Sequence, residues 1–314
     1  MGVMACVAWC TSVAVIRYLA QDLGPFVAAV LQLGLAGGIG IARSLILRQF
    51  RNDLTGLSWS YLLACGSCFI ICQVCLLLAI GLAAGGPQVI VVGMLNYFWP
   101  ALTLALSVVI LGHRWNGWLI PGLLVTIAGE AMVVGGPLLV ANGEGLSIST
   151  RDAIPYTLAA IAALSWALFS NLARRLAGNQ SGNAVPLFMC ISACVMAPFA
   201  LLFPFTLKFS AMTGLALAFS VFLPGLLAYT WWDRGMRMGN IKGLTIVSYL
   251  IPLGSTLTTS LMLRTLPDWP VWIGAVVVIA GAGICHYAVG SSSEPAEHTA
   301  TAATLAKREP VKGI

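Results

Sequence analysis

Residues 91–110 read VVGMLNYFWPALTLALSVVI, and residues 243–262 read GLTIVSYLIPLGSTLTTSLM. Both stretches are mostly apolar and about 20 residues long, which is the length that an α-helix needs to cross a lipid bilayer. A shift of 152 residues superimposes them without a gap, pairing Tyr97 with Tyr249 and Pro100 with Pro252. The chain is therefore expected to contain a repeated set of membrane helices.

The composition of the whole chain is that of a membrane protein. Of its 314 residues, 59% are hydrophobic and 8% are charged, and the mean hydropathy is +0.94. Soluble domains carry about a quarter charged residues, so this chain lacks the polar surface that water requires. The net charge of +6 is scattered through short connectors, which argues against a nucleic-acid partner. All nine cysteines lie in apolar runs, so no disulfide framework is expected.

Dividing the chain at its polar residues, glycines and prolines predicts ten membrane-spanning helices. Their expected bounds are 2–20, 26–47, 58–83, 88–111, 118–140, 153–175, 184–204, 210–234, 241–264 and 270–290. Five spans fall in residues 1–140 and five in residues 153–290, and the polar segment 291–314 is expected to be a disordered cytoplasmic tail. We predict an all-α integral membrane protein with two five-helix halves.

The repeat also extends beyond the two quoted stretches. The shift of 152 pairs Gly122 with Gly274, and a shift of 157 pairs Trp9 with Trp166. Because each half holds an odd number of spans, the two halves enter the membrane in opposite directions. Inverted repeats are the architecture of secondary transporters, which bind substrate near mid-membrane where the repeats meet and work by alternating access.

Lysine and arginine in short connectors tend to stay on the cytoplasmic side of a membrane. With the N-terminus inside, 12 of the 16 basic residues fall on inner connectors or the tail. The four on the outer side are Arg17, Arg151, Lys208 and Arg264. We therefore expect both termini in the cytoplasm.

Two polar stripes are candidates for the lining of a transport pathway. Asn96, Pro100, Thr103 and Ser107 share one helix face, and the matching positions in the second half are Ser248, Pro252, Ser255 and Thr259. A proline frees a backbone carbonyl, which only a cavity or a partner can satisfy inside a membrane. We predict that Pro100 and Pro252 break or hinge their helices. The alternative is that small hydroxyl residues merely let helices pack closely.

Aromatic side chains gather near these stripes. Their ring faces can stack on an apolar or aromatic solute, or hold an ammonium group. The residues expected to bind substrate are Trp9, Gln73, Asn96, Tyr97, Trp99, Trp166, Tyr229, Trp232, Ser248 and Tyr249. Tryptophans at span ends, such as Trp59 and Trp115, are better explained by an interfacial aromatic belt.

Few other residues suggest chemistry within the membrane. Glu130 lies near the middle of the fifth span and is a candidate for proton coupling. The stripe Cys65, Cys68, Cys72 and Cys75 would suit a soft metal, but no histidine lies beside it, so we interpret it as helix packing and expect no metal or cofactor. The motifs His-Glu-x-x-His, Gly-x-Ser-x-Gly and Walker A are absent from the sequence, which disfavours an intramembrane lipid-modifying enzyme.

The stretch 93–103 (GMLNYFWPALT) resembles the drug/metabolite transporter superfamily of EamA type. Further similar pieces within residues 1–290 are Ala8-Trp9, Gly24-Pro25, Pro121-Gly122-Leu123-Leu124 and Ser248-Tyr249 with Pro252. The resemblance implies a ten-span carrier with inverted five-helix repeats in a bacterial inner membrane. It also implies export of aromatic and other amino acids through a cavity between the first, third, fourth, sixth, eighth and ninth spans. One departure is that the first helix starts at Met1 without a polar lead.

We therefore expect a non-enzymatic exporter with a largely uncharged mid-membrane cavity that holds a zwitterion through dipoles and ring faces. Amino acids and the lipid bilayer are its expected partners, and a monomer is the expected state. Efflux of cationic drugs or other small metabolites is the alternative, for which an aromatic wall without a buried acid is a weaker fit.

Overall fold

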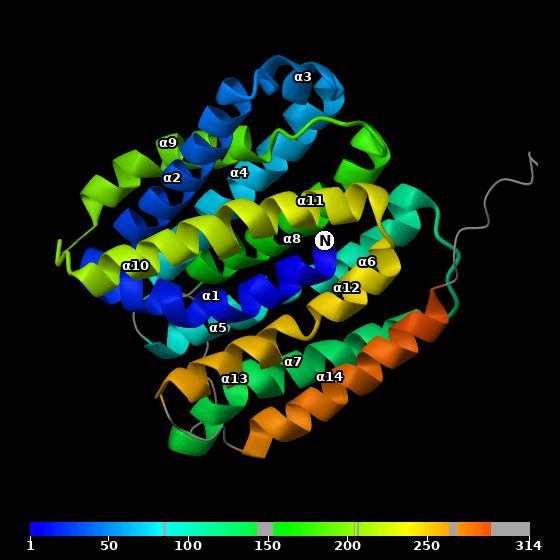
Figure 1. Ribbon diagram of the computed structural model, residues 1–314. Helices are drawn as coiled ribbons and strands as arrows, with labels where there is room; N and C mark the ends of the chain where they lie inside the picture. Colours follow the sequence, from blue (N-terminus) through cyan, green and yellow to red (C-terminus); the bar gives the residue numbers. More distant parts are fainter. Residues whose placement is uncertain (84–85, 143–152, 204, 206, 264–268, 290–314) are drawn as a thin grey trace, which may run out of the picture.

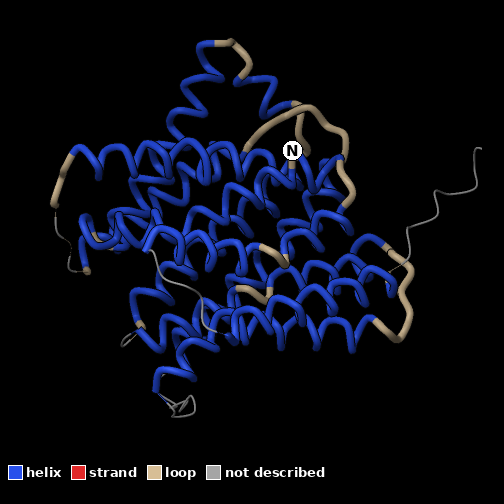
Figure 2. Tube along the Cα trace, turned by 60° about the horizontal axis from the view of Figure 1, so that its bottom comes forward, coloured by secondary structure: helices blue, strands red, loops and turns tan. Residues whose placement is uncertain are grey.

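The computed structural model describes residues 1–83, 86–142, 153–203, 205, 207–263 and 269–289. The predicted tail 291–314 lies outside this part of the chain. The described residues form a bundle of packed helices joined by short connections (Figure 2). The helices of the first half are α1 (Gly2–Leu23), α2 (Pro25–Ile46), α3 (Phe50–Thr55), α4 (Trp59–Leu82), α5 (Gly86–Asn96), α6 (Trp99–Leu111) and α7 (Leu119–Asn142). Those of the second half are α8 (Ala153–Ala177), α9 (Val185–Leu202), α10 (Ala211–Ser220), the π-helical η2 (Val221–Leu227), α11 (Ala228–Met238), α12 (Ile241–Ser248), α13 (Ile251–Leu263) and α14 (Trp269–Ala288).

The helices agree with the predicted membrane spans. Eight of them, some built from consecutive elements, are long and apolar enough to cross a bilayer. The helix α1 would make a ninth span, because its parts Gly2–Ser12 and Ala14–Leu23 meet at 46° but pass the test together. The remaining predicted span is α7, which contains the shorter apolar stretch Leu119–Val133. The fold is thus an all-α membrane bundle.

Two spans are interrupted just before a proline. The helix α5 ends at Asn96 and α6 begins at Trp99, so that Pro100 occupies the first turn of α6, where a missing backbone N–H does no harm. In the second half, Pro252 takes the same place in the first turn of α13. Each proline leaves the carbonyl four residues earlier, that of Asn96 or Ser248, without its usual helical donor.

A third proline, Pro224, lies inside η2 and widens the helix locally into a π-helix. Because Pro224 has no N–H, the carbonyl of Ser220 loses its helical donor. Gln32 of α2 replaces that donor, with its Nε2 3.1 Å from the Ser220 oxygen. The carbonyl of Pro224 in turn accepts a hydrogen bond of 3.1 Å from the indole Nε1 of Trp9. The distortion therefore fixes α1 and α2 to the middle of the eighth predicted span.

The two halves interlock by exchanging their first helices. The helix α1 packs against α11 and α13 of the second half, and α8 packs against α4 and α6 of the first half (Figure 1). The equivalent helices α2 and α9 lie side by side, as do α7 and α14. The centre of the bundle is consequently built from both halves, as expected for an inverted repeat.

Glycines set the close approach of α7 and α14. A Cβ atom on Gly129 would lie 2.6 Å from the backbone nitrogen of Val278, so any larger residue would separate the helices. On the facing helix, a Cβ atom on Gly281 would collide with Thr126. Small residues at such positions let membrane helices pack backbone to backbone. Gly129 and Gly281 also occupy equivalent positions in the two halves, which explains their repetition in the sequence.

The two ends of the bundle differ in charge. One end, which we call the basic end, carries Arg43, Arg48, Arg51, Arg114, Arg174, Arg175, Arg234, Arg237 and Lys242. Arg174 joins α8 to the end of α11, since its Nη1 donates to the carbonyl of Gly239 over 3.1 Å. Burial and the positive charges of Arg174 and Lys242 lower the pKa of His113, which leaves its ring neutral at pH 7. Of the four basic residues predicted for the opposite end, Arg151 and Arg264 lie outside the described residues.

Candidate substrate cavity

A cavity of about 140 Å³ lies in the middle of the bundle, between helices of both halves. Its wall consists of Trp9, Ser12, Cys72, Gln73, Leu76, Asn96, Tyr97, Trp99, Trp166, Tyr229 and Ile251. None of these lining side chains is charged. Rings, short aliphatic groups, amides, hydroxyls and a thiol therefore surround the space.

The aromatic rings support each other by edge-to-face packing. The ring centroid of Trp9 lies 5.7 Å from that of Trp166 and 5.4 Å from that of Tyr229. The rings of Trp166 and Tyr229 are 5.6 Å apart at 76°. Such T-shaped pairs are favourable because a positive ring edge meets a negative ring face. The mutual packing holds these rings rigidly around the cavity.

Polar atoms in the wall come from several helices and from one helix break. Gln73 of α4 donates from Nε2 to the hydroxyl of Tyr229 on α11 over 2.9 Å, which links the two halves across the cavity. The second N–H of the Gln73 amide and its carbonyl oxygen provide further hydrogen-bonding capacity. Asn96 supplies both a side-chain amide and the carbonyl that Pro100 frees. These groups suit the charged ends of a small zwitterion.

Aromatic residues close the cavity toward the basic end. Trp232 is completely buried, with its ring 5.4 Å from that of Trp9 and 5.2 Å from that of Trp99. Its indole Nε1 donates to Ser170 Oγ over 3.1 Å, and that hydroxyl donates to the carbonyl of Trp166. The hydrogen bond to Ser170 of α8 and the ring contact with Trp9 of α1 hold Trp232 behind the cavity wall.

Beyond this aromatic layer lie three buried polar side chains, Tyr61, Asp233 and Arg237, which we call the polar seal. The Tyr61 hydroxyl donates to Asp233 Oδ1 over 2.7 Å, and Asp233 Oδ2 lies 3.0 Å from Arg237 Nε. Arg237 also donates from Nη1 to the Gln180 carbonyl and from Nη2 to the Gly182 carbonyl, over 3.1 and 2.8 Å. The Asp233 and Arg237 side chains are each 2% exposed, so the two charges compensate each other inside the protein.

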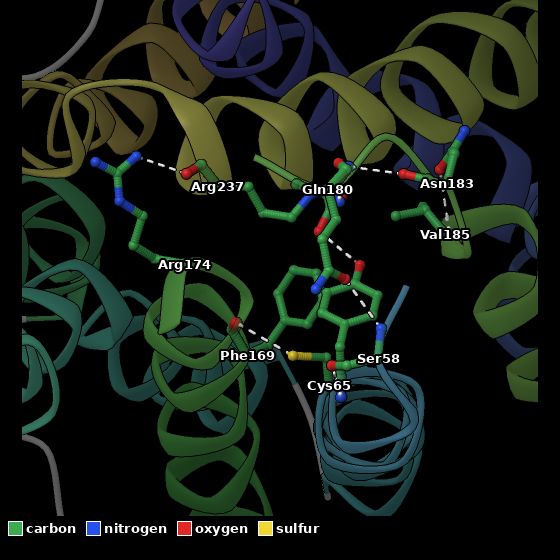
Figure 3. A network of polar contacts seen from close by, with 11 residues as sticks. Ser58, Cys65, Phe169, Arg174, Gln180, Asn183, Val185 and Arg237 are labelled. Atoms are coloured by element: carbon green, nitrogen blue, oxygen red, sulfur yellow. Dashed lines mark hydrogen bonds and ion pairs between the residues drawn. The ribbon is translucent and has the colours of Figure 1, made fainter. Parts of the chain in front are cut away.

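The connection from α8 to α9 fastens the polar seal to the first half (Figure 3). The backbone N–H of Ser58 donates to Gln180 Oε1 over 2.9 Å, and Ser58 Oγ donates to the Leu176 carbonyl over 3.1 Å. Asn183 donates its backbone N–H to the carbonyl of Asp53. Arg174 Nη1 lies 2.5 Å from the Arg237 carbonyl. Both halves therefore hold the basic end closed.

The structure brings most of the predicted binding residues together. Seven of them line the cavity, namely Trp9, Gln73, Asn96, Tyr97, Trp99, Trp166 and Tyr229, and Trp232 lies directly behind them. Ser248 and Tyr249 lie away from the lining. Ser248 Oγ bonds to the carbonyl of Thr245 in its own helix, over 2.6 Å. Tyr249 is completely buried against Ala101 and Val278, because α12 packs against α6 and α14.

Other predicted polar residues are also placed outside the lining. Both carboxylate oxygens of Glu130 on α7 are buried and have no hydrogen-bond partner among the described residues. Thr103 and Ser107 bond to the carbonyls of Trp99 and Leu104 in their own helix, over 2.7 Å each. In the described part of the chain, side chains of His, Cys, Asp and Glu do not form a group of three or more that could hold a metal ion.

The sequence pattern missed several residues of this region. Ser12, Cys72, Leu76 and Ile251 line the cavity. Of these, only Cys72 belonged to a stripe that the sequence marked, and that stripe was interpreted as helix packing. The sequence did contain a signal for the polar seal, since Asp233 and an arginine four residues later share a helix face.

Inverted halves, helices broken where the halves meet and a cavity at mid-bundle define a membrane transporter fold. The chain belongs to the EamA-like transporter family, whose model matches residues 1–135 and again 153–285. It is 30% identical over 284 residues to the aromatic amino acid exporter YddG of Salmonella typhimurium (strain 14028s / SGSC 2262), covering 90% of this chain and 94% of that protein. The YddG protein of Escherichia coli (strain K12) is 30% identical over 290 residues, with the same shares.

A solved crystal structure has the same fold. It superposes on this chain with a TM-score of 0.76 at 24% sequence identity, covering 90% of this chain and 94% of the other. The likeness to that structure therefore extends over both halves.

Proposed function

We propose that this protein is a non-enzymatic secondary transporter that exports aromatic and other amino acids through the central cavity. The observation that carries this proposal is the wall of rings, amides and aliphatic groups with no charged side chain among its lining residues. Its family membership and its similarity to proteins named aromatic amino acid exporters support the same assignment. We further propose that it resides in a bacterial inner membrane.

In this proposal the ends of the amino acid meet different parts of the wall. The α-carboxylate accepts a hydrogen bond from the second N–H of the Gln73 amide. The α-ammonium group meets the carbonyl of Asn96 and an aromatic face, which attracts a cation through its π electrons. The substrate side chain packs on the rings of Trp9 and Trp166.

An apolar pocket discriminates weakly between side chains. One methylene group changes the binding free energy by about 1–3 kcal/mol, so neighbouring amino acids are separated by moderate factors. We therefore propose a broad range of substrates that favours large apolar side chains.

Alternating access would require the basic end to open, because the polar seal closes it here. We propose that the basic end faces the cytoplasm, in keeping with its concentration of arginines. Opening would break the bond between Tyr61 and Asp233, which joins α4 of the first half to α11 of the second. The buried pair of Asp233 and Arg237 could then move as one body with α11, so that its charges stay compensated.

Glu130 is our candidate for coupling transport to a proton gradient. Its carboxyl group is buried on α7, and α7 packs against both α5 and α13, the elements beside the two helix breaks. A proton taken up or released there would alter the packing next to the breaks. This role is separable from substrate binding, because Glu130 is not part of the cavity wall.

Uptake of labelled phenylalanine into proteoliposomes tests the proposal. We expect saturable uptake that is absent from protein-free vesicles and competed by tryptophan and tyrosine. An imposed pH gradient would change the rate only if transport is coupled to protons, and Glu130→Gln would then remove the change. Equal uptake into vesicles with and without the protein would contradict the proposal.

A further inference from the structure

A second cavity, of about 300 Å³, lies at the basic end between α2, α3, α9 and η2. It is about twice as large as the central cavity, and the two cavities share no lining residue. Helix α11 and the preceding η2 separate them, since Thr230 faces the second cavity while its neighbour Tyr229 faces the central one. The second cavity is therefore a distinct site.

Two opposite charges line this second cavity. Arg43 lies on the last turn of α2, and Asp53 lies on α3. In the described part of the chain no ion pair joins Arg43 to Asp53, so the two charges share the space without closing on each other. A cavity that holds a cation and an anion apart is complementary to a zwitterion.

The Asp53 carboxylate is held in place by its neighbours. Its Oδ2 accepts a hydrogen bond from the Ser44 hydroxyl. The carbonyl of Asp53 accepts one from the backbone N–H of Asn183, over 3.2 Å. Because these contacts fix α3 against α2 and α9, the second cavity is formed before any ligand arrives, which lowers the entropic cost of binding.

The remaining wall is largely apolar. Phe50 and Leu54 of α3 line it together with Leu187 of α9 and Leu226 of η2. Such a surface accommodates an aromatic or aliphatic side chain once the charged groups have been paired. The hydroxyl of Thr230 adds a hydrogen-bonding group.

We propose that this second cavity is a binding site for a zwitterionic amino acid with an apolar side chain. The α-carboxylate pairs with Arg43, the α-ammonium group pairs with Asp53, and the side chain packs against Phe50 and Leu54. An anionic lipid phosphate fits less well, because it would be repelled by Asp53. The choice of ligand rests on the proposed function, since it is the class of solute that the central cavity would carry.

The position of the second cavity would connect its occupancy to the polar seal. Its lining includes Asn183, the residue after Gly182, whose carbonyl accepts a hydrogen bond from Arg237. It also includes Thr230, one turn before Asp233 on α11. A ligand bound between these segments lies next to the polar seal. Its binding would couple the amino acid concentration at the basic end to the movement of α11.

Equilibrium dialysis of labelled phenylalanine against the purified full-length protein in nanodiscs tests this proposal. Two molecules per chain are expected for the wild type and one per chain for Arg43→Gln or Asp53→Asn. Each change removes a charged hydrogen-bonding partner and should weaken that site about tenfold or more. Asp53→Asn retains an acceptor for Ser44, so the wall should stay intact. Arg51→Gln is the matched control, because Arg51 lies on α3 outside the lining and should retain two molecules.

Ligands with one charge assign each contact. Phenylethylamine lacks the carboxylate, so its affinity for the second site should not fall in Arg43→Gln. 3-Phenylpropanoate lacks the ammonium group, so its affinity should not fall in Asp53→Asn. A loss of affinity for phenylethylamine in Arg43→Gln, or for 3-phenylpropanoate in Asp53→Asn, would overturn the proposed orientation.

If the wild type binds one phenylalanine per chain and Arg43→Gln leaves that number unchanged, the second site is ruled out. Vesicle uptake would still support the proposed function in that case. A phospholipid that phenylalanine does not displace from the cavity would rule out the second site as well. Absence of vesicle uptake together with two bound molecules would instead contradict the transport function and leave the second site standing.

Discussion

The central cavity and the polar seal both include side chains of α11, but they differ in charge. Along α11, Tyr229 faces the cavity, and Arg237 lies two turns further on, about 12 Å away at 1.5 Å per residue. The cavity is lined by uncharged groups, whereas the seal contains an ion pair that is buried from solvent. The protein thus places this buried ion pair beside the central cavity and not in its wall.

This difference indicates separate tasks for the two regions. A charge in the cavity would bind one end of a zwitterion strongly and slow its release. At the polar seal, the two charges pair with each other and Arg237 also bonds to backbone carbonyls, so removing either partner would leave the other charge buried and unpaired. Substitutions in the seal should therefore alter stability and opening, while substitutions in the cavity should alter substrate affinity.

The largest effect is expected from Arg237→Met. It leaves the Asp233 carboxylate buried without its partner, which costs about 3–5 kcal/mol for such pairs. Thermal unfolding in detergent should show a marked loss of stability. The double variant Asp233→Leu with Arg237→Met removes both charges and should recover most of that loss. A single variant as stable as the wild type would show that the pair is not a structural element.

Gln73→Leu should affect transport more than stability. It keeps the volume of the side chain but removes the amide that bonds to Tyr229 and, in our proposal, to the substrate carboxylate. A hydrogen bond to a charged group contributes about 1.5–3 kcal/mol, so the apparent KM for phenylalanine should rise about tenfold or more. Tyr229→Phe retains the ring and should change the KM less. An unaltered KM in Gln73→Leu would exclude the amide from substrate binding.

Tyr61→Phe should have a moderate effect confined to the seal. The change removes one hydrogen bond between the halves, of about 1.5–3 kcal/mol because its acceptor is a carboxylate, and keeps the pair of Asp233 with Arg237. Hydrogen exchange should become faster at the basic ends of α4 and α11, with little change along α7 and α14. Unchanged exchange in α11 would mean that this bond does not hold the closed state.

Glu130→Gln should have the smallest effect on uptake without a pH gradient. Its side chain lies outside the cavity, and glutamine nearly preserves its shape. The initial rate for phenylalanine should stay close to that of the wild type when both sides of the vesicle have the same pH. A large loss under those conditions would place Glu130 in substrate handling instead of coupling.

Much of the bundle could be predicted because the relevant signals are local. Hydropathy defined the spans closely, as with residues 153–175 against the helix Ala153–Ala177. The prolines at 100 and 252 marked two places where a span is interrupted. Such features depend on the covalent chemistry of the chain and on the length of a bilayer-crossing helix.

The surroundings of a residue depend on which helix packs against it, and the sequence repeat does not predict that packing. Tyr97 and Tyr249 are equivalent in sequence, yet Tyr97 lines the cavity and Tyr249 packs between α6 and α14. The polar seal was equally hard to foresee. The spacing of Asp233 and Arg237 indicates a pair, but its burial requires Tyr61 and carbonyls from the distant connection between α8 and α9.

The most direct test of the uncharged cavity is the initial rate of phenylalanine uptake by proteoliposomes in the presence of competing solutes. We expect tryptophan and leucine to reduce the rate, tetraphenylphosphonium to leave it unchanged, and Gln73→Leu to raise the KM without unfolding the protein. Transport of the phosphonium cation with no transport of phenylalanine would contradict the proposal that this cavity carries amino acids.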